Sequence, residues 1–241
     1  MRFSVVVPVL NEEKTLSETL KSIRSQTLKD FELIVVDNGS TDGSVEIARE
    51  YADMVLFEEK KGSINAIKRG FSKATGEILV CCDADSIYPK DYLEKLDRIF
   101  KDEKVVAVYG PFIFKEKGKI FNIGSIIVYT ILNALSSIFG VPLAGAANFA
   151  IRKKFYERSG GYNFGDLASQ DFRLARKLKA FGKVVYSPKL IVMTSYRRFE
   201  RQGLIRGLWR AFLFWLDVAL NLNRKKMEDY YERSYYEDKG L

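Results

Sequence analysis

The sequence predicts an α/β fold with a mostly parallel, Rossmann-like central sheet and helices on both of its faces. Two observations carry this prediction. Within residues 3–110, short apolar or β-branched runs alternate with segments whose apolar residues recur at helical spacing, a pattern typical of βαβ units. In addition, 47% of the 241 residues are hydrophobic, which is enough for the core of one large α/β domain. Ligands of such sheets bind beyond the carboxyl ends of the strands, so the loops there are the first candidates for a functional site.

Each element follows from a local pattern. Strands are expected where apolar runs end at turn-forming residues, at 3–8, 31–36, 55–57, 77–82 and 105–110. Helices are expected where apolar residues recur every three or four positions, at 12–26, 45–51, 63–75 and 91–100. Ordinary α/β patterning returns later in the chain, with a helix at 171–181 and a strand at 184–186.

Charge and the missing histidine narrow the chemistry. Lys and Arg number 39 against 31 Asp and Glu, giving a formal net charge of +8, and the chain contains no histidine. That lack excludes His-dependent triads, His-ligated metals and an imidazole base. The basic balance favours an anionic partner, such as nucleic acid, a nucleotide diphosphate or an acidic membrane surface. Cys81 and Cys82 are adjacent and cannot bridge distant loops, and no secretory signal pattern opens the sequence, so we expect an intracellular protein.

Residues 120–141 form the first of two long apolar segments. They contain no charged residue, and their length would suffice to span a bilayer. Polar and small residues nevertheless recur every three or four positions, at Asn122, Ser125, Tyr129, Asn133, Ser136 and Gly140. This stripe favours an amphipathic helix lying against the protein or at a bilayer interface over a membrane span.

Residues 204–222 form the second apolar segment. Its aromatic and aliphatic residues lie opposite a narrow polar strip, and arginines gather around its start, at positions 197, 198, 201, 206 and 210. Basic residues beside Trp and Phe on one helix are what an interfacial membrane anchor requires. A core helix packed on the sheet would explain the pattern equally well. The tail at 224–241 indicates no function.

An Asp-x-Asp pair is the first sign of chemistry. Asp83 and Asp85, separated by the small Ala84, directly follow the expected strand at 77–82. Two carboxylates at a strand end can hold a divalent cation against a diphosphate. Solvated loop aspartates are the alternative, but the position in line with the loop at Asp37 favours a shared pocket.

The loops after the first two strands are the second sign. They read PVLNEEKTL and LIVVDNGSTDGS, and Asp37 closes the second strand. An acidic residue there can bind a nucleobase or ribose, and exposed loop amides can bind the rest of a nucleotide. Helix capping by Asn11 or Ser40 would account for those two residues without any ligand.

Five segments together resemble glycosyltransferase family 2. PVLNEEKTL, VVDNGSTDGS, ATGEILVCCDADS, GAANFAIRKKFYERSGGY and QDFRLARKLKAFG occur in that family's order and spacing, and the similarity covers roughly residues 3–195. The resemblance implies the GT-A fold and an inverting, nucleotide-sugar-dependent enzyme.

The resemblance also implies roles for individual residues. Nucleotide-sugar binding is expected at Pro8, Leu10, Glu12, Asp37, Asp83, Ala84 and Asp85. A Mn²⁺ or Mg²⁺ ion is expected on Asp85, the more direct ligand, and Asp83. The sugar and acceptor are expected to face Gly145, Ala146, Ala147 and Asn148, and Asp171 matches the catalytic base.

Asp171 suits that role chemically. An inverting transfer needs one carboxylate to take the proton of the acceptor hydroxyl as its oxygen attacks the anomeric carbon. Asp171 also begins a helix, so its position taken alone favours an N-terminal cap or a partner of the helix dipole. Together with the resemblance, the position favours the base.

Three departures from the family pattern bear on the site. Gln170 stands where the family usually has the first acid of its acidic pair. Lys68 replaces a common asparagine and would either reach the diphosphate or be solvated. The histidine usual near Thr194 or Ser195 is absent, and we expect Arg197 or Arg198 to compensate by contacting phosphate oxygens.

The sequence therefore predicts a metal-dependent inverting glycosyltransferase that takes a UDP- or GDP-sugar and a hydroxyl or lipid-linked acceptor. Residues 1–110 would bind the nucleotide sugar, residues 111–196 would complete the same domain with the acceptor and catalytic groups, and residues 197–241 would add the basic helix and tail. We expect a cytoplasmic protein in peripheral contact with the cytosolic face of a membrane, and no nucleic-acid partner. A sugar-nucleotide pyrophosphorylase, or a non-enzymatic protein that binds membranes or nucleic acid, is the alternative.

Overall fold

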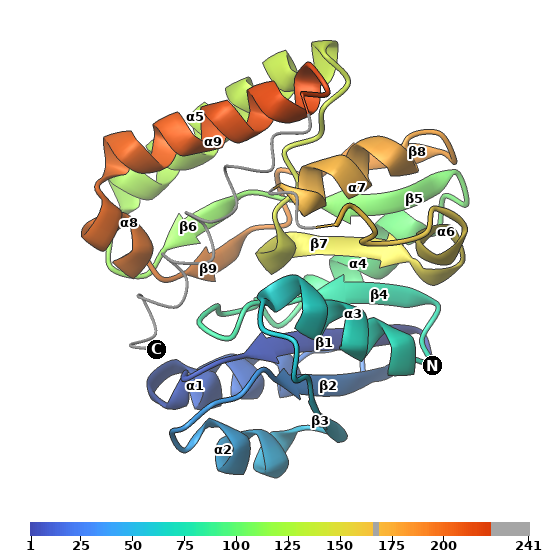
Figure 1. Cartoon of the computed structure of the whole chain (residues 1–241), viewed down its shortest axis with the longest axis vertical. Coiled ribbons are helices and arrows are strands. Elements are labelled where there is room, and N and C mark those ends of the chain that lie inside the picture. Colours follow the sequence, from blue (N-terminus) through green and yellow to red (C-terminus); the bar gives the residue numbers. More distant parts are fainter. Residues whose placement is uncertain (166–168, 223–241) are drawn as a thin grey trace.

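A computed structural model describes residues 1–165 and 169–222, without the side chains of residues 198, 201, 202, 204 and 205. Its centre is a seven-stranded sheet in the order β3-β2-β1-β4-β7-β5-β8 (Figure 1). The strands are β1 (Phe3–Val9), β2 (Phe31–Asp37), β3 (Met54–Phe57), β4 (Ile78–Cys81), β5 (Val105–Tyr109), β7 (Phe149–Arg152) and β8 (Lys183–Tyr186). All neighbouring strands are parallel except β7, which runs antiparallel to both β4 and β5. The predicted mostly parallel α/β fold is confirmed.

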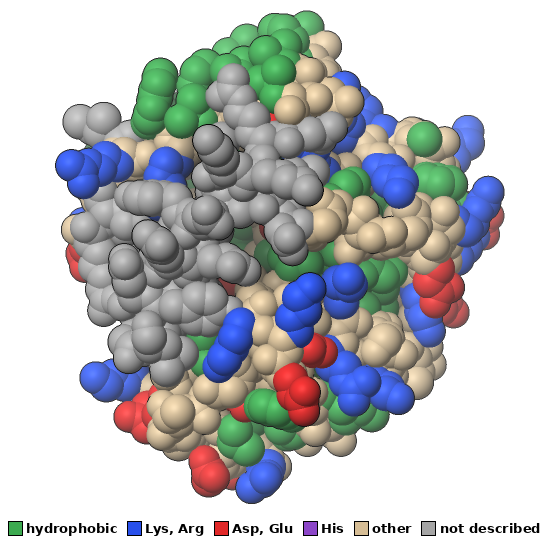
Figure 2. Space-filling model, viewed as in Figure 1, with side chains coloured by type: hydrophobic (Ala, Val, Ile, Leu, Met, Phe, Trp, Pro, Cys, Tyr) green, Lys and Arg blue, Asp and Glu red, His purple; other side chains and the backbone are tan. Residues whose placement is uncertain are grey.

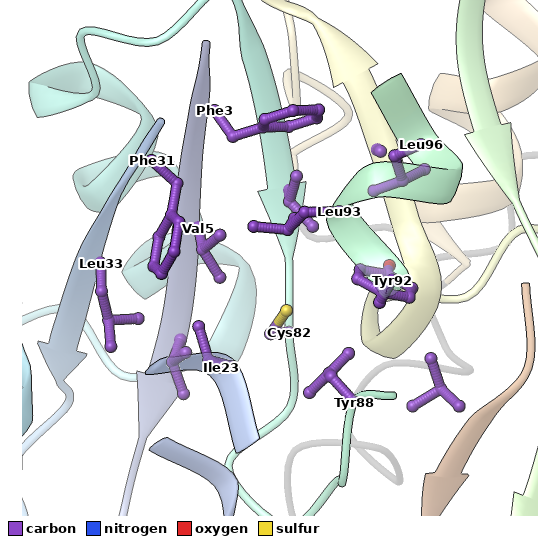
Figure 3. Packing of buried hydrophobic residues seen from close by; sticks show 14 of the residues in the cluster. Phe3, Val5, Ile23, Phe31, Leu33, Cys82, Tyr88, Tyr92, Leu93 and Leu96 are labelled. Atoms are coloured by element: carbon purple, nitrogen blue, oxygen red, sulfur yellow. The ribbon is translucent and has the colours of Figure 1, made fainter. Parts of the chain in front are cut away.

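Helices cover both faces of this sheet because the strands are apolar on both sides. One face carries α1 (Glu13–Arg24), α2 (Ser44–Tyr51) and α4 (Tyr92–Phe100), and the other carries α3 (Ser63–Lys73) and α7 (Gln170–Leu178). In β1, Val5 and Val7 belong to the first core cluster and Val6 to the second, as the period of two in a strand requires. Figure 3 shows the first cluster, in which Leu93 of α4 lies next to Phe3 and Val5 of β1, and Tyr92 of α4 packs against Tyr88.

Apart from helix α6 (Lys153–Arg158), which begins beside the start of β4, the other elements lie at the carboxyl edge of the parallel strands or beyond it. Strands β6 (Phe112–Phe114) and β9 (Val192–Thr194) form a separate parallel pair, and a short 3₁₀ turn, η1, spans Ala146–Asn148. Helix α6 follows β7 directly. Helices α5 (Lys119–Ile138), α8 (Arg197–Gln202) and α9 (Leu204–Ala219) gather at one end of the molecule, where α5 and α9 lie side by side (Figure 1).

Helix α5 faces the protein with its polar stripe. Tyr129 donates a hydrogen bond to the carbonyl of Leu143, Asn133 accepts one from Tyr109, and the indole of Trp215 on α9 donates one to Ser136 at 2.6 Å. The opposite side is aliphatic, with exposures of 46–89% at Ile120, Ile123, Ile127, Val128, Ile131, Leu132, Leu135 and Ile138. An amphipathic helix of a water-exposed domain normally has the reverse orientation.

Within the described part of the chain, α5 is the one helix that is long and apolar enough to cross a membrane by length and composition. Only 11% of the most apolar 18-residue stretch of this helix is buried. The tail predicted at 224–241 lies outside the described residues.

A buried ion pair fastens α9 to α7. Arg173 and Asp217 are in contact, and each side chain is only 7% exposed. One turn further along α7, Arg176 donates a hydrogen bond to the carbonyl of Val218. Because α7 also carries Asp171 in its first turn, the position of that residue is coupled to the packing of α9.

We expect Asp217→Ala to lower the free energy of unfolding by about 3–5 kcal/mol, because it removes one member of a buried ion pair. Urea denaturation would measure the loss. The matched control is Asp102→Ala, which breaks the exposed pair with Lys183 (44% and 58% exposed) and should leave the free energy of unfolding nearly unchanged. Equal losses in the two variants would show that the Arg173–Asp217 pair does not hold α9 in place.

Candidate functional site

The candidate site lies at the carboxyl edge of the parallel strands, where the loops after β1, β2 and β4 meet. Thr15 and Thr19 on α1 donate hydrogen bonds to the carbonyl of Ala84 at 3.3 and 2.9 Å. These bonds tie the loop that holds Asp83 and Asp85 to the helix that follows β1. Pro8 and Leu10 stand at the end of β1 on the same edge, with Leu10 buried.

The loops after β1 and β2 hold each other. The hydroxyl of Ser40 accepts a hydrogen bond from the backbone N–H of Asn11 at 3.0 Å, and the side-chain oxygen of Asn11 accepts one from the N–H of Thr41 at 2.8 Å. Neither residue is a helix cap, because the N-caps of α1 and α2 are Glu12 and Gly43. The capping interpretation of Asn11 and Ser40 is therefore wrong, and the two residues connect neighbouring loops instead.

Asp37 ends β2 and organises the turn that follows it. Its buried carboxylate accepts hydrogen bonds from the backbone N–H groups of Gly39 and Ser40, both at 3.1 Å. Gly39 has a φ of +93°, and a Cβ there would lie 2.5 Å from the Lys61 ammonium, so the turn requires glycine. The Lys61 ammonium also donates to the carbonyl of Asn38 at 3.1 Å. Asp37 thus holds its own turn by hydrogen bonds, and the Lys61 ammonium lies against the same turn.

Asp85, Glu12 and Arg197 form the charged centre of the site. The Arg197 guanidinium donates to Glu12 Oε2 at 2.6 Å and to Asp85 Oδ2 at 3.2 Å. Glu12 and Asp85 are 8% and 20% exposed, whereas Arg197 is 39% exposed. The guanidinium therefore neutralises two carboxylates that come from different loops. Partial burial opposes the charge of Arg197, but these two carboxylates together outweigh it and raise the pKa of Arg197.

The carboxylates at this edge suit a hard divalent cation only in part. Among the described residues, no group of three or more Asp, Glu or Cys side chains is arranged to hold a metal ion. Asp85 supplies carboxylate oxygens, with Asp83 two residues away in the same loop. Mg²⁺ is commonly bound by one or two carboxylates together with substrate phosphates. The residues fit a cation that arrives with a diphosphate.

A chain of hydrogen bonds runs from the Asp83 loop to residues 146–147. The backbone N–H of Asp83 donates to the hydroxyl of Tyr88 at 2.9 Å, and that hydroxyl donates to the carbonyl of Ala147 at 2.9 Å. The N–H of Ala146 in turn donates to the carboxylate of Asp171. The predicted metal-binding loop, the segment at 145–148 and the predicted base therefore belong to one connected unit.

Asp171 is the strongest acid–base candidate. Its Oδ1 accepts a hydrogen bond from the hydroxyl of Tyr162 at 2.6 Å. Burial raises the pKa of Asp171 to about 6, against the opposing effect of the hydrogen bonds from Tyr162 and Ala146. The N-cap of α7 is Ser169, so the alternative of Asp171 as that cap is wrong, although its place in the first turn suits the helix dipole.

Some predicted residues lie apart from these contacts. Asn148 is fully buried, and its amide joins the hydroxyl of Tyr92 to the carbonyls of Pro111 and Leu190. Lys68 is exposed on α3. The side chain of Arg198 lies outside the described residues. Gly145 packs against the ring of Phe112 at the start of the segment.

Sequence reasoning did not single out Tyr88, Tyr162, Thr15 or Thr19. Tyr162 closes the segment GAANFAIRKKFYERSGGY, and Tyr88 follows the Asp-x-Asp pair closely, so both stand within or beside the motifs. Their chemical signal is weak because buried tyrosines are ordinary core residues. Only their hydroxyl contacts in three dimensions mark them as supports of the site.

Comparisons with known proteins give a consistent result. The family model described as glycosyl transferase family 2 matches residues 4–160. Poly-beta-1,6-N-acetyl-D-glucosamine synthase of Staphylococcus epidermidis is 28% identical over 229 residues, which cover 88% of this chain and 53% of that protein. The chain therefore spans about half the length of this curated relative.

Solved structures share the fold. A mannosyltransferase from Pyrobaculum calidifontis, in complex with GDP-Man and Mn²⁺, aligns with a TM-score of 0.69 at 24% identity over 88% of this chain and 64% of that one. TarS (residues 1–349) of Staphylococcus aureus, in complex with UDP-GlcNAc, aligns with a TM-score of 0.62 at 20% identity over 81% of this chain and 58% of that one.

Proposed function

The chain belongs to glycosyltransferase family 2, and we propose that it moves a sugar from a UDP- or GDP-sugar to a hydroxyl or lipid-linked acceptor with inversion at the anomeric carbon. The observation that carries this proposal is the connected unit of the Asp83 loop, residues 146–147 and Asp171. This unit connects the loop where a diphosphate would bind, at Asp83, to the carboxylate of Asp171, which is suited to proton transfer. The family membership favours a transferase over a pyrophosphorylase or a non-enzymatic binding protein.

The donor would lie across the carboxyl edge of β1, β2 and β4. Pro8, Leu10, Glu12 and Asp37 would line the base and ribose, in keeping with the division into a donor half at 1–110 and a catalytic half at 111–196. Asp85 with Asp83 would hold Mn²⁺ or Mg²⁺, which when bound neutralises charge on the leaving diphosphate. The mannosyltransferase of similar fold, whose structure contains GDP-Man and Mn²⁺, supports both the donor class and the divalent ion.

Asp171 would act as the base. As the acceptor oxygen bonds to the anomeric carbon, the bond to the diphosphate oxygen breaks on the opposite face, and the proton of the acceptor hydroxyl passes to the Asp171 carboxylate. A pKa of about 6 leaves this carboxylate ionised at neutral pH yet more basic than an ordinary aspartate. Tyr162 and Ala146 hold its orientation.

A donor panel tests the proposal directly. The chain would be incubated with Mn²⁺ and UDP- or GDP-sugars labelled in the sugar, each with soluble oligosaccharides or with extracted membrane lipids. We expect label to move from one donor to one acceptor class, together with release of the matching nucleoside diphosphate. Absence of both transfer and nucleotide release across the panel would contradict the proposed function.

A peripheral contact with an anionic membrane completes the proposal. The exposed apolar side of α5 continues onto α9, where Leu208, Trp209 and Phe212 are 46–60% exposed. Figure 2 shows hydrophobic side chains gathered at the end of the molecule that these helices occupy in Figure 1. We name the exposed residues of α5 and these three of α9 the apolar surface. Exposed apolar faces of this extent are typical of membrane or protein contact sites.

Charge favours an anionic lipid surface as the occupant. Lys119 begins α5 and Arg206 lies in the first turn of α9, and both are exposed. The described part of α5 contains no acidic residue. Basic residues beside an apolar helix face attract anionic headgroups while the apolar side chains enter the acyl boundary. This arrangement supports a lipid-linked acceptor and a location on the cytosolic face of a membrane.

We expect the double variant Ile127→Glu, Leu135→Glu to bind anionic vesicles at least about tenfold more weakly than the wild type, because two apolar side chains would no longer be buried in lipid. Flotation with vesicles of phosphatidylcholine, alone or mixed with phosphatidylglycerol, would measure it. Phe57→Glu is the control, since Phe57 is equally exposed but lies on edge strand β3. Unchanged vesicle binding by the double variant would overturn the membrane contact.

A further inference from the structure

Arg197 contacts the carboxylate of Asp85, which a divalent ion would have to bind in a metal-dependent donor site. Its guanidinium contacts Asp85 Oδ2 at 3.2 Å and Glu12 Oε2 at 2.6 Å. Asp85 is the predicted direct ligand of the cation, and Glu12 is a predicted donor-pocket residue. One arginine side chain therefore binds carboxylates from both of the loops that the donor would use.

The backbone holds this arginine in place. Glu116 accepts hydrogen bonds from the hydroxyl of Ser195 at 3.0 Å and from the N–H of Tyr196 at 2.7 Å, immediately before Arg197. Tyr196 is buried and packs against Phe114 at a ring-centroid distance of 5.1 Å. The turn from β9 into α8 is thus anchored on both sides. The fold itself directs Arg197 toward Asp85.

The carboxylates have their own supports. The hydroxyl of Thr15 donates to Glu12 Oε2 at 2.9 Å, and the backbone N–H of Glu12 donates to Ser44 at 2.8 Å. Asp85 Oδ1 lies 3.5 Å from the hydroxyl of Thr194, a weaker contact. Asp85 is also more exposed than Glu12, at 20% against 8%. Of the two carboxylates, Asp85 is therefore the one that can exchange its partner.

We infer that Arg197 neutralises Asp85 while the site holds no donor. When a divalent ion binds Asp85, Arg197 leaves this carboxylate and binds the diphosphate of the donor instead. This inference rests on the proposed function and deepens it. A divalent ion and a guanidinium on the same carboxylate repel each other at close range. The diphosphate relieves this repulsion, because its oxygens offer the guanidinium another anionic partner that suits its planar, forked geometry.

The exchange has a consequence that can be measured. The divalent ion alone must compete with Arg197 for Asp85 and therefore binds weakly. When the nucleotide binds as well, the ion replaces Arg197 at Asp85 and the diphosphate gives Arg197 a new partner, so the two bind well together. Metal and nucleotide binding are therefore positively coupled through Arg197. By linkage, the nucleotide strengthens ion binding by the same factor as the ion strengthens nucleotide binding.

The experiment measures Mn²⁺ binding by the loss of the free-ion electron paramagnetic resonance signal, and nucleotide binding by calorimetry with UDP and GDP. For Arg197→Ala we expect about tenfold stronger binding of Mn²⁺ alone, but about tenfold weaker binding of the nucleotide in the presence of Mn²⁺. Arg197→Lys keeps the charge and should retain the weak Mn²⁺ binding of the wild type. Arg98→Ala, which removes a 69% exposed arginine on α4, is the matched control and should change neither value.

The expected rise in Mn²⁺ affinity and fall in nucleotide affinity distinguish this role from a structural one. A residue that merely held the turn would weaken both kinds of binding when removed, and that result, or unchanged Mn²⁺ binding in Arg197→Ala, would overturn the inference. If wild-type protein bound neither UDP nor GDP with Mn²⁺ present, the proposed function itself would fail. The two failures are thus distinguishable.

Discussion

Replacing Asp171 by asparagine should reduce the rate of transfer to a hydroxyl acceptor by about 10²- to 10⁴-fold, the usual contribution of a positioned base. Asparagine has nearly the same shape, and its side-chain oxygen can still accept the hydrogen bond from Tyr162. Donor binding should therefore stay unchanged while the chemical step slows. Steady-state kinetics with the donor identified by the panel, together with nucleotide titration, would separate the two effects.

Asp91→Asn is the control for this substitution, because Asp91 pairs with Lys95 at the start of α4 and is half exposed. It should leave the rate unchanged. If Asp171→Asn kept more than about a tenth of the activity, Asp171 would not be the base. That result would point to an acceptor that is already an anion, such as a phosphate, which needs little help to lose a proton.

The raised pKa of Asp171 sets the pH dependence of the same variant. Because the base must be ionised, the wild-type rate should rise as the pH increases through about 6, and Asp171→Asn should lose this inflection. In the unfolded state the pKa of this carboxyl is near 3.8, so the folded state holds the proton more tightly. The group therefore lowers the free energy of unfolding as the pH rises between 3.8 and 6. At pH 7, Asp171→Asn should therefore raise the free energy of unfolding by at most about 3 kcal/mol.

Asp85→Ala should abolish the strengthening of nucleotide binding by Mn²⁺, which we expect to be about 100-fold, within the usual range of coupling between two ligands. Arg197 would keep its contact with Glu12, so the turn before α8 should remain folded. Calorimetry of the variant with Mn²⁺, and again after chelation, would give the comparison. Tighter binding with Mn²⁺ than without it, retained in Asp85→Ala, would show that the ion is held elsewhere.

The sequence was most informative about the sheet. The β-branched runs and the helical spacing between them predict the order of elements from β1 to β5, because both patterns depend on residues close together in the chain. The antiparallel strand β7 was not predicted. Its four residues carry no sign of strand direction, and it inserts between β4 and β5, which are themselves separated by α4.

Contacts between distant residues account for the rest of the site. Arg197 and Glu12 are 185 positions apart, so their pairing follows from the fold and cannot be inferred from local pattern. The polar stripe of α5 predicted an amphipathic helix but not which side faces the protein. The structure shows that hydrogen bonds from Tyr109 and Trp215 direct the polar side inward and leave the aliphatic side exposed.

The central claim is that a nucleotide diphosphate binds with a divalent ion at the carboxyl edge of β1, β2 and β4. Calorimetric titration of the wild-type chain with UDP and with GDP, each in the presence and absence of Mn²⁺, tests it most directly. We predict that one nucleotide binds and that Mn²⁺ strengthens its binding. If neither nucleotide bound with Mn²⁺ present, the assignment of this edge as a donor site would be contradicted.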